Sequence, residues 1–107
     1  MNTNNYPDRE ELNAIRFWIV RENASMEENL EGLMDYIEPL WTQHGSFLKK
    51  SNMYFLSTGG WSGNEDIISA LEQNHMFWAL FACSWERGGH FVFATLEVWI
   101  NKLMGNK

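Results

Sequence analysis

The chain has 107 residues, which leaves room for one compact domain of roughly 100–200 residues and not for two. Hydrophobic residues make up 45% of it and aromatic residues 15%, with only 2 prolines, which excludes a disordered or collagen-like chain. Fourteen acidic against eight basic residues give a net charge of −6. Proteins that bind DNA or RNA polymers need lysine and arginine against the phosphates, so this charge argues against such ligands.

Features that the sequence lacks indicate where the protein is located and which cofactors it can bind. No apolar run approaches the roughly 20 residues of a membrane span, and the first residues do not resemble a signal peptide. We therefore expect a cytoplasmic protein with no membrane partner. The single cysteine, Cys83, cannot form an internal disulfide, and its apolar neighbours indicate an inert buried thiol. His44, His75 and His90 are too scattered for a zinc motif, so we expect no metal and no cofactor.

The first element predicted is a helix that begins after a flexible arm, residues 1–7. Asp8 is a suitable N-cap, and apolar residues recur at helical spacing at Leu12, Ile15 and Ile19. Residues 14–20 also contain β-branched and aromatic side chains typical of a strand. The choice between helix and strand stays open for this segment.

A second helix is predicted from residue 26 to Pro39. Ser25 and Glu28 form an S-x-x-E capping box, and the apolar residues that follow have helical spacing. Residues 40–52 are predicted to be a connection.

The second half of the chain is predicted to contain strands around one helix. Residues 53–57 indicate a buried strand, and residues 58–65, TGGWSGNE, a turn. Ile67, Ile68 and Leu71 mark a helix that Ser62 or Asn64 can cap. Residues 76–85 and 90–98 are strand candidates joined by a tight turn with Gly88-Gly89, and residues 99–107 add a helical turn or two.

These elements predict the α+β class, with one domain over residues 1–107. Two N-terminal helices are followed by a β-α-β-β unit, a small mixed sheet with helices packed on it. If strands 53–57 and 76–85 run parallel in one sheet, both end at the same edge. The turn at 58–65 and the hairpin at 86–90 then converge, at the edge where open α/β sheets place ligands.

The converging residues have the chemistry of a site for a small anionic ligand. Glycines allow close approach of the backbone, the helix N-terminus carries unpaired N–H groups, and Arg87 offers a bidentate fork. The indole of Trp61 provides a surface for stacking, which favours a nucleotide-like ligand. There is no P-loop lysine and no G-x-G-x-x-G fingerprint. The predicted ligand-binding residues are Thr58, Gly59, Gly60, Trp61, Ser62, Asn64, Glu65, Arg87 and His90.

Simpler interpretations exist for each of these residues. The glycines can serve only to turn the chain, and Trp61 can serve as a lid over the core. A catalytic hypothesis rests on Glu65 and His90 as an acid–base pair with Ser62 as nucleophile. We expect a non-catalytic binding protein, one that sequesters a host molecule, rather than an enzyme.

The alternative function is an acidic protein–protein inhibitor of a host enzyme. Nine carboxylates lie between Asp8 and Glu38, a pattern that is typical of solvated helices and also suits a basic protein partner. The 7 Phe, 6 Trp and 3 Tyr exceed what a core of this size readily hides, which is compatible with a homodimer.

The motifs TGGWSGNEDII, FW and RGGHFVF, within residues 53–93, resemble a group of short uncharacterised proteins encoded by tailed bacteriophages and prophages. The resemblance implies a small accessory phage protein that acts by binding in the cytoplasm of an infected bacterium. The resemblance is silent on activity, substrate and cofactor.

Overall fold

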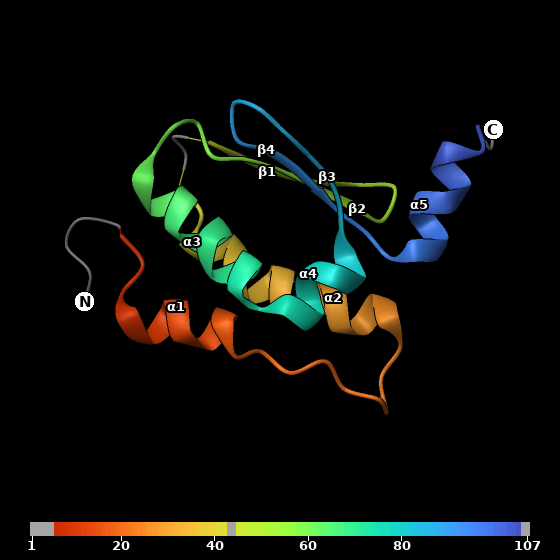
Figure 1. Cartoon of the computed structure of the whole chain (residues 1–107), viewed down its shortest axis with the longest axis horizontal. Helices are drawn as coiled ribbons and strands as arrows, with labels where there is room; N and C mark the ends of the chain where they lie inside the picture. The colour runs from red at the N-terminus through yellow and green to blue at the C-terminus, as the bar shows by residue number, and fades with distance from the viewer. Residues whose placement is uncertain (1–5, 43–44, 106–107) are drawn as a thin grey trace.

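A four-stranded sheet in the order β1-β2-β4-β3 forms one layer of the chain, and the helices α1 to α4 form the other (Figure 1). The structure is a computed structural model that describes residues 6–42 and 45–105. Its strands are β1 (Ser46–Lys50), β2 (Met53–Ser57), β3 (Ala82–Glu86) and β4 (His90–Phe93). Its helices are α1 (Arg9–Arg16), α2 (Met26–Ile37), the 3₁₀ helix η1 (Glu38–Leu40), α3 (Ser62–Gln73), α4 (His75–Phe81) and α5 (Leu96–Leu103).

The α+β class and the two N-terminal helices are confirmed. In α1 the Asp8 carboxylate accepts from Glu11 N at 2.8 Å, and Glu11 bonds back to Asp8 N. Ser25 and Glu28 make the same reciprocal pair in α2. The question over residues 14–20 is settled, because the helix ends at Arg16 and residues 17–25 form an irregular loop. Of the predicted arm, residues 1–5 lie outside the described part of the chain.

The strand predicted over residues 76–85 is wrong in its first half, which is the helix α4. The Asn74 side chain accepts a hydrogen bond from Phe77 N at 3.1 Å and so caps this helix. Phe77 and Phe81, four residues apart, then point together into the core. An apolar run buried on one side is compatible with either element, and here the cap decides it.

Two further boundaries differ from the prediction. The connection at residues 40–52 contains β1, an edge strand whose two lysines and mostly exposed side chains hide the strand pattern. The strand predicted over residues 90–98 ends at Phe93. Thr95 accepts from Val98 N at 3.3 Å and starts α5. The predicted caps Ser62 and Asn64 both lie inside α3, whose N-cap is Trp61.

Every neighbouring pair of strands in the sheet is antiparallel, so the sheet is not mixed. β2 and β3 both pair with β4, which lies between them. They therefore run in the same direction without touching, and both end at the same edge. The two bends were predicted to converge because both strands end at the same edge of the sheet, and this is what the structure shows. The strands reach that edge through antiparallel pairing with β4 and not through direct parallel pairing.

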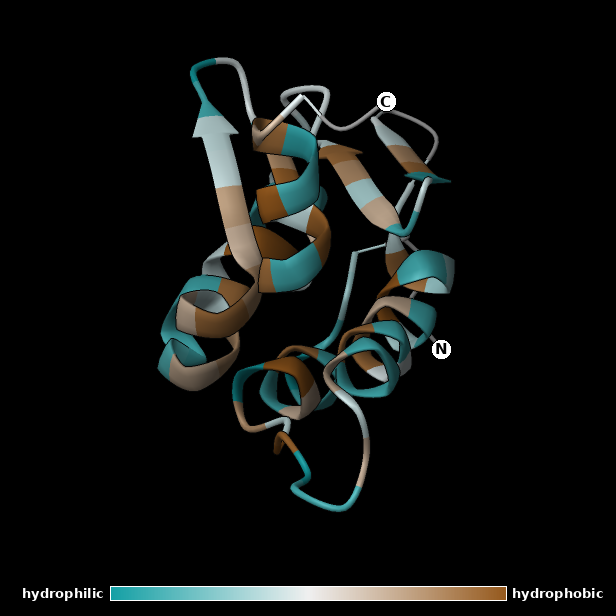
Figure 2. Cartoon of the chain, turned by 90° about the vertical axis from the view of Figure 1, so that its right-hand side faces the viewer, coloured by the Kyte–Doolittle hydropathy of each residue, from teal (hydrophilic) through white to brown (hydrophobic). Residues whose placement is uncertain are grey.

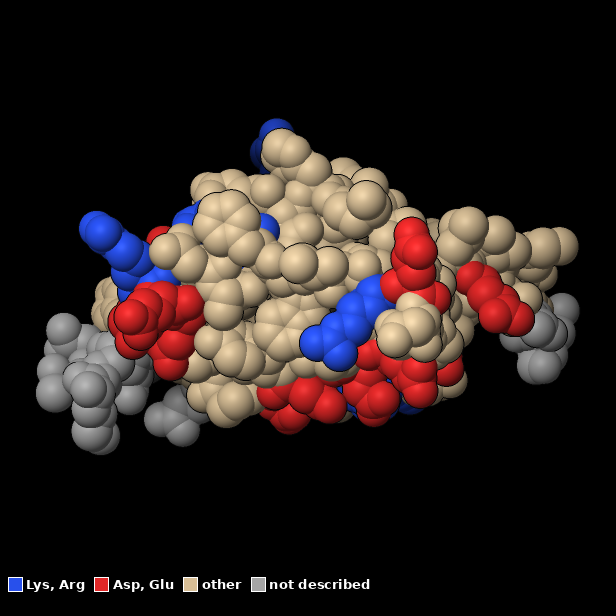
Figure 3. All heavy atoms as spheres, turned by 90° about the horizontal axis from the view of Figure 1, so that it is seen from below, with Lys and Arg blue, Asp and Glu red and all other residues tan. Residues whose placement is uncertain are grey.

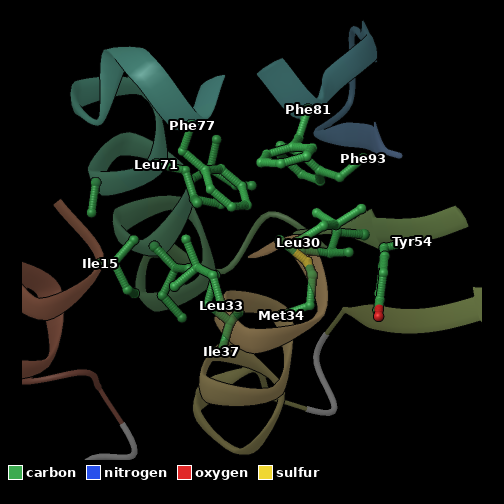
Figure 4. Packing of buried hydrophobic residues seen from close by; sticks show 14 of the residues in the cluster. Ile15, Leu30, Leu33, Met34, Ile37, Tyr54, Leu71, Phe77, Phe81 and Phe93 are labelled. Carbon is green, nitrogen blue, oxygen red and sulfur yellow. The ribbon is translucent and has the colours of Figure 1, made fainter. Parts of the chain in front are cut away.

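One hydrophobic core joins the two layers. Ile15 of α1, Leu33 of α2 and Leu71 of α3 meet on the helical side, and Phe77 and Phe93 close it against the sheet (Figure 4). All five side chains are fully buried. Burying a side chain of this size stabilises the fold by about 1.5–3 kcal/mol, so this cluster is the main source of stability.

Buried asparagines hold the segments that have no regular structure. Asn74 donates to the carbonyls of Ile15 at 3.0 Å and Trp18 at 2.9 Å, which fixes the end of α1 on the corner between α3 and α4. Asn29 accepts from Arg21 N at 2.7 Å and donates to Arg21 O at 2.9 Å, which fixes the loop before α2. The described part of the chain has no helix long and apolar enough to cross a membrane.

We predict that Asn74→Ala lowers the free energy of unfolding by about 2–4 kcal/mol. The change removes the hydrogen bonds to the carbonyls of Ile15 and Trp18 and also removes the α4 cap. The matched control is Asn101→Ala on the exposed surface of α5, expected to change stability by less than about 0.5 kcal/mol. Urea denaturation of both variants measures this, and equal midpoints would contradict the structural role of Asn74.

Candidate functional site

The two glycine-rich bends meet at one edge of the sheet. Thr58 N donates to Gly89 O at 3.0 Å, and the Ser57 hydroxyl lies 2.7 Å from His90 Nδ1. A Cβ atom on Gly89 would overlap the Thr58 side chain, so only glycine allows this approach. Segments more than thirty positions apart along the chain are therefore direct neighbours.

The first bend is a tight turn at Thr58-Gly59-Gly60-Trp61. Trp61 N donates to Thr58 O at 3.2 Å, and Gly59 and Gly60 have φ angles of 65° and 75°. Positive φ at both central positions is the geometry of a type I′ turn, which favours glycine. Thr58 is buried, and its hydroxyl accepts from Gly60 N at 3.3 Å. The threonine therefore serves the turn itself.

The indole of Trp61 lies against its own helix rather than open to a ligand. A Cβ atom on Gly63 would overlap the Trp61 ring, which shows how closely the ring covers that residue. The Tyr6 ring also packs against the indole, with the ring centroids 4.6 Å apart. The Tyr6 hydroxyl also bonds Ser62 Oγ at 2.8 Å. The segment before α1 thus packs on the start of α3.

Asn64 is a structural residue at the centre of the first bend. It has no exposed surface, its Oδ1 accepts from Thr42 N at 3.1 Å, and its Nδ2 donates to Thr58 O at 3.2 Å. These bonds connect the turn to the segment that follows η1. The amide is engaged by the chain and is directed away from solvent.

Three of the predicted residues present charged or titratable side chains to solvent: Glu65, Arg87 and His90. Glu65 borders a hollow of about 230 Å³ beside Thr58 and Gly89, and Glu72 borders the same hollow. Two carboxylates there disfavour an anion on that side. Arg87 lies at the tip of the second bend, on the segment that leads to His90.

The catalytic hypothesis gains no geometric support from these residues. His90 is hydrogen-bonded to Ser57, and Ser62, the proposed nucleophile, is hydrogen-bonded to Tyr6. Burial raises the pKa of the Cys83 thiol, which favours its protonated, unreactive form. No group of three or more metal-ligating side chains occurs in residues 6–42 and 45–105.

A second site, not predicted as such from the sequence, lies between α1, the 17–25 loop and α2. It is a cleft of about 700 Å³, whose lining includes Phe17, Trp18, Ile19, Arg21 and Glu28. Phe17 is 71% exposed and Ile19 is 75% exposed. The spacing of Ile19 placed it on the buried face of a helix, which is wrong because the helix ends before it.

The cleft is held open by contacts on both sides. Trp18 packs against Tyr36 of α2, with ring centroids 5.3 Å apart, and its carbonyl is held by Asn74. Asn29, which lines the cleft, fixes the backbone of Arg21. Phe17 and Ile19 alternate with the anchored Trp18, so both are turned outward. A segment with fixed backbone loses little conformational entropy on binding.

The surroundings of the cleft are acidic. Residues 1–45 contain nine acidic and three basic residues, which accounts for the whole net charge of −6. Figure 3 shows acidic side chains at several places around a largely uncharged area of one face of the molecule, with a basic side chain at its edge. Burial raises the pKa of Tyr36, and the carboxylates of Glu11 and Asp8 raise it further. The negative field of α1 therefore reaches Tyr36, whose ring packs against Trp18 of the cleft lining.

No family model, curated protein or solved structure matches this chain. The resemblance of residues 53–93 to phage-encoded proteins stays a prediction.

We predict that Gly89→Ala destabilises the chain more than Gly60→Ala. Both residues have positive φ, 79° and 75°, so each substitution carries a strain of about 1–2 kcal/mol. Only Gly89 faces a packed neighbour, whereas nothing lies within 4 Å of a Cβ atom on Gly60. Thermal or urea denaturation is expected to show an additional loss of about 1–3 kcal/mol for Gly89→Ala. Equal losses would mean that the two bends are not in contact.

Proposed function

We propose that this chain is a non-catalytic protein that binds a basic protein partner in the cleft between α1, the 17–25 loop and α2. The observation that carries the proposal is the exposure of Phe17 and Ile19, at 71% and 75%, beside a preformed cleft. Large apolar side chains with this exposure are typical of interface centres, where they become the residues that dominate affinity.

The electrostatics of the cleft define the partner. An apolar centre surrounded by carboxylates suits a segment that carries one or two apolar side chains between lysines and arginines. The excess of acid in residues 1–45 attracts such a partner from a distance and repels acidic surfaces. In the phage setting that the sequence motifs suggest, the partner is a host protein, and binding blocks its activity.

The test is retention of a basic partner from bacterial lysate by the immobilised chain, followed by affinity measurement with the purified partner. We expect Phe17→Ala combined with Ile19→Ala to weaken binding by about 2–4 kcal/mol, because buried contact residues of this size contribute on that scale. Met76→Ala, which removes a 63% exposed apolar side chain from α4, is the matched control and is expected to bind normally.

The contribution of charge to binding can be measured separately, by varying the salt concentration and with one further pair of variants. Raising the salt concentration is expected to weaken binding, and Glu22→Lys beside the cleft is expected to weaken it more than Glu97→Lys on α5. A partner that is retained equally by the double alanine variant would overturn the proposal.

A small anionic, nucleotide-like ligand at the two bends is a second candidate. The observation that favours it is the contact between the bends, where Thr58 bonds Gly89 and Ser57 bonds His90, on the same hairpin that carries the exposed Arg87. The internal bonds of Asn64 and the packing of Trp61 leave the ligand fewer groups than the sequence suggested.

A thermal-shift series with nucleotides and cyclic dinucleotides tests this second candidate. A ligand present at 100 times its dissociation constant is expected to stabilise the chain by about 2.7 kcal/mol. Arg87→Ala is expected to abolish the shift, because it removes the exposed guanidinium at the hairpin tip. The absence of any shift, or a shift that Arg87→Ala leaves unchanged, would exclude the site.

A further inference from the structure

The helix α5 carries an apolar stripe that its own chain leaves uncovered. Leu96, Ile100 and Leu103 fall on one face of the helix, followed by its C-cap Met104, and all four are exposed, Leu103 at 66% and Met104 at 78%. No residue of α5 is buried. Figure 1 shows the helix standing beyond the end of the sheet, and Figure 2, viewed from that side, shows hydrophobic segments along it.

The sheet offers a second uncovered apolar surface. Its outer face is the side turned away from α1 to α4, because Tyr54 and Leu56 of β2 point inward to the core and Phe55 points the other way. Across the strands Leu48, Phe55 and Val92 are direct partners and form an apolar row on this face. Leu48 is 56% exposed.

A hollow of about 400 Å³ lies over the Phe55 and Val92 part of this row. Phe55 and Val92 line it, and Ser84, Glu86 and His90 border it with polar groups. The apolar row spans about 10 Å across three strands, and the eight residues of α5 extend about 12 Å. The stripe and the row are therefore similar in length.

The helix cannot fold back over its own sheet without breaking buried contacts. Only Ala94 and Thr95 separate α5 from β4, and both are buried. Ala94 N donates to Phe81 O at 3.0 Å, and the Thr95 hydroxyl caps the helix. The connection is thus too short and too firmly held to act as a hinge.

We propose that a second copy of this chain covers both surfaces, with α5 of each copy lying on the outer face of the other copy's sheet. The chain itself supplies both the helix and the surface that matches it in length. In a two-fold arrangement each helix–sheet contact occurs twice, which doubles the apolar area that is buried.

Charge favours a copy of this chain over an acidic or basic partner at this face. Residues 46–107 contain five acidic and five basic residues, so this half has no net charge. The helices α1 and α2, which carry many of the acidic residues, lie on the inner side of the sheet (Figure 1), where Glu31 pairs with Lys49 of β1. Glu97 borders the apolar stripe of α5, and Lys50 flanks the apolar row of the sheet. When α5 of one copy lies on the sheet of the other, these two opposite charges attract each other.

The experiment is the molar mass of the full chain by sedimentation equilibrium, from about 1 µM to about 1 mM. We expect twice the 12.6 kDa mass of one chain at the higher concentrations. Leu103→Glu on α5 and Leu48→Glu on the sheet are each expected to weaken association roughly tenfold or more, because each places a charge in an apolar contact. Met76→Glu, an exposed apolar position on α4, is the control and is expected to associate normally.

Mixing the two defective variants adds a test of the geometry. The Leu103→Glu chain keeps an intact sheet and the Leu48→Glu chain keeps an intact helix, so the mixture is expected to form a mixed dimer with one intact contact. Circular dichroism of each variant verifies that the fold is retained, since both positions are exposed.

A monomeric mass at every concentration would overturn the proposal. So would a dimer that Leu103→Glu disrupts and Leu48→Glu does not, because this indicates contact between helices alone. A dimer disrupted equally by Met76→Glu, or one that neither α5 nor sheet variants affect, would place the interface elsewhere and overturn it as well.

Discussion

The hydrogen bonds of Asn74 are the constraint on which the arrangement of the helices depends. One side-chain amide holds the Ile15 and Trp18 carbonyls at the end of α1, while the same side chain caps α4 through Phe77 N. Buried polar groups are costly unless paired, so these bonds hold α1 firmly against the corner between α3 and α4. The loop that follows α1 therefore begins from a fixed point, and Asn29 fixes its other end.

This constraint separates the two candidate sites. At the cleft the asparagines anchor the backbone and leave Phe17 and Ile19 facing solvent, so the exposed groups are available to a partner. At the glycine bends Asn64 bonds Thr42 and Thr58, and Trp61 packs on its own helix, so the chain uses much of what a ligand would need. The same kind of residue builds a binding surface at one place and a closed junction at the other.

Local signals predicted the parts of the fold that local interactions determine. The capping boxes at Asp8 and Ser25, the strand at residues 53–57 and the meeting of the two bends follow from residues close in sequence or from strand direction. The helix α4 does not follow from its residues alone, because the same Asn74 both ends α3 and caps α4. The exposure of Ile19 depends on where α1 stops, and tertiary bonds from Asn74, far along the chain, set that point. The type of residue at the bends was predictable, but the burial of Asn64 was not.

The most direct test of the account is nuclear magnetic resonance mapping of the isotope-labelled chain during titration with its purified basic partner. Shift changes are predicted at residues 14–24 and 28–32, which border the cleft, with none at residues 58–65 and 87–90. Changes centred on the two bends, with the cleft resonances unmoved, would contradict the claim that the asparagine-anchored loop is the binding surface.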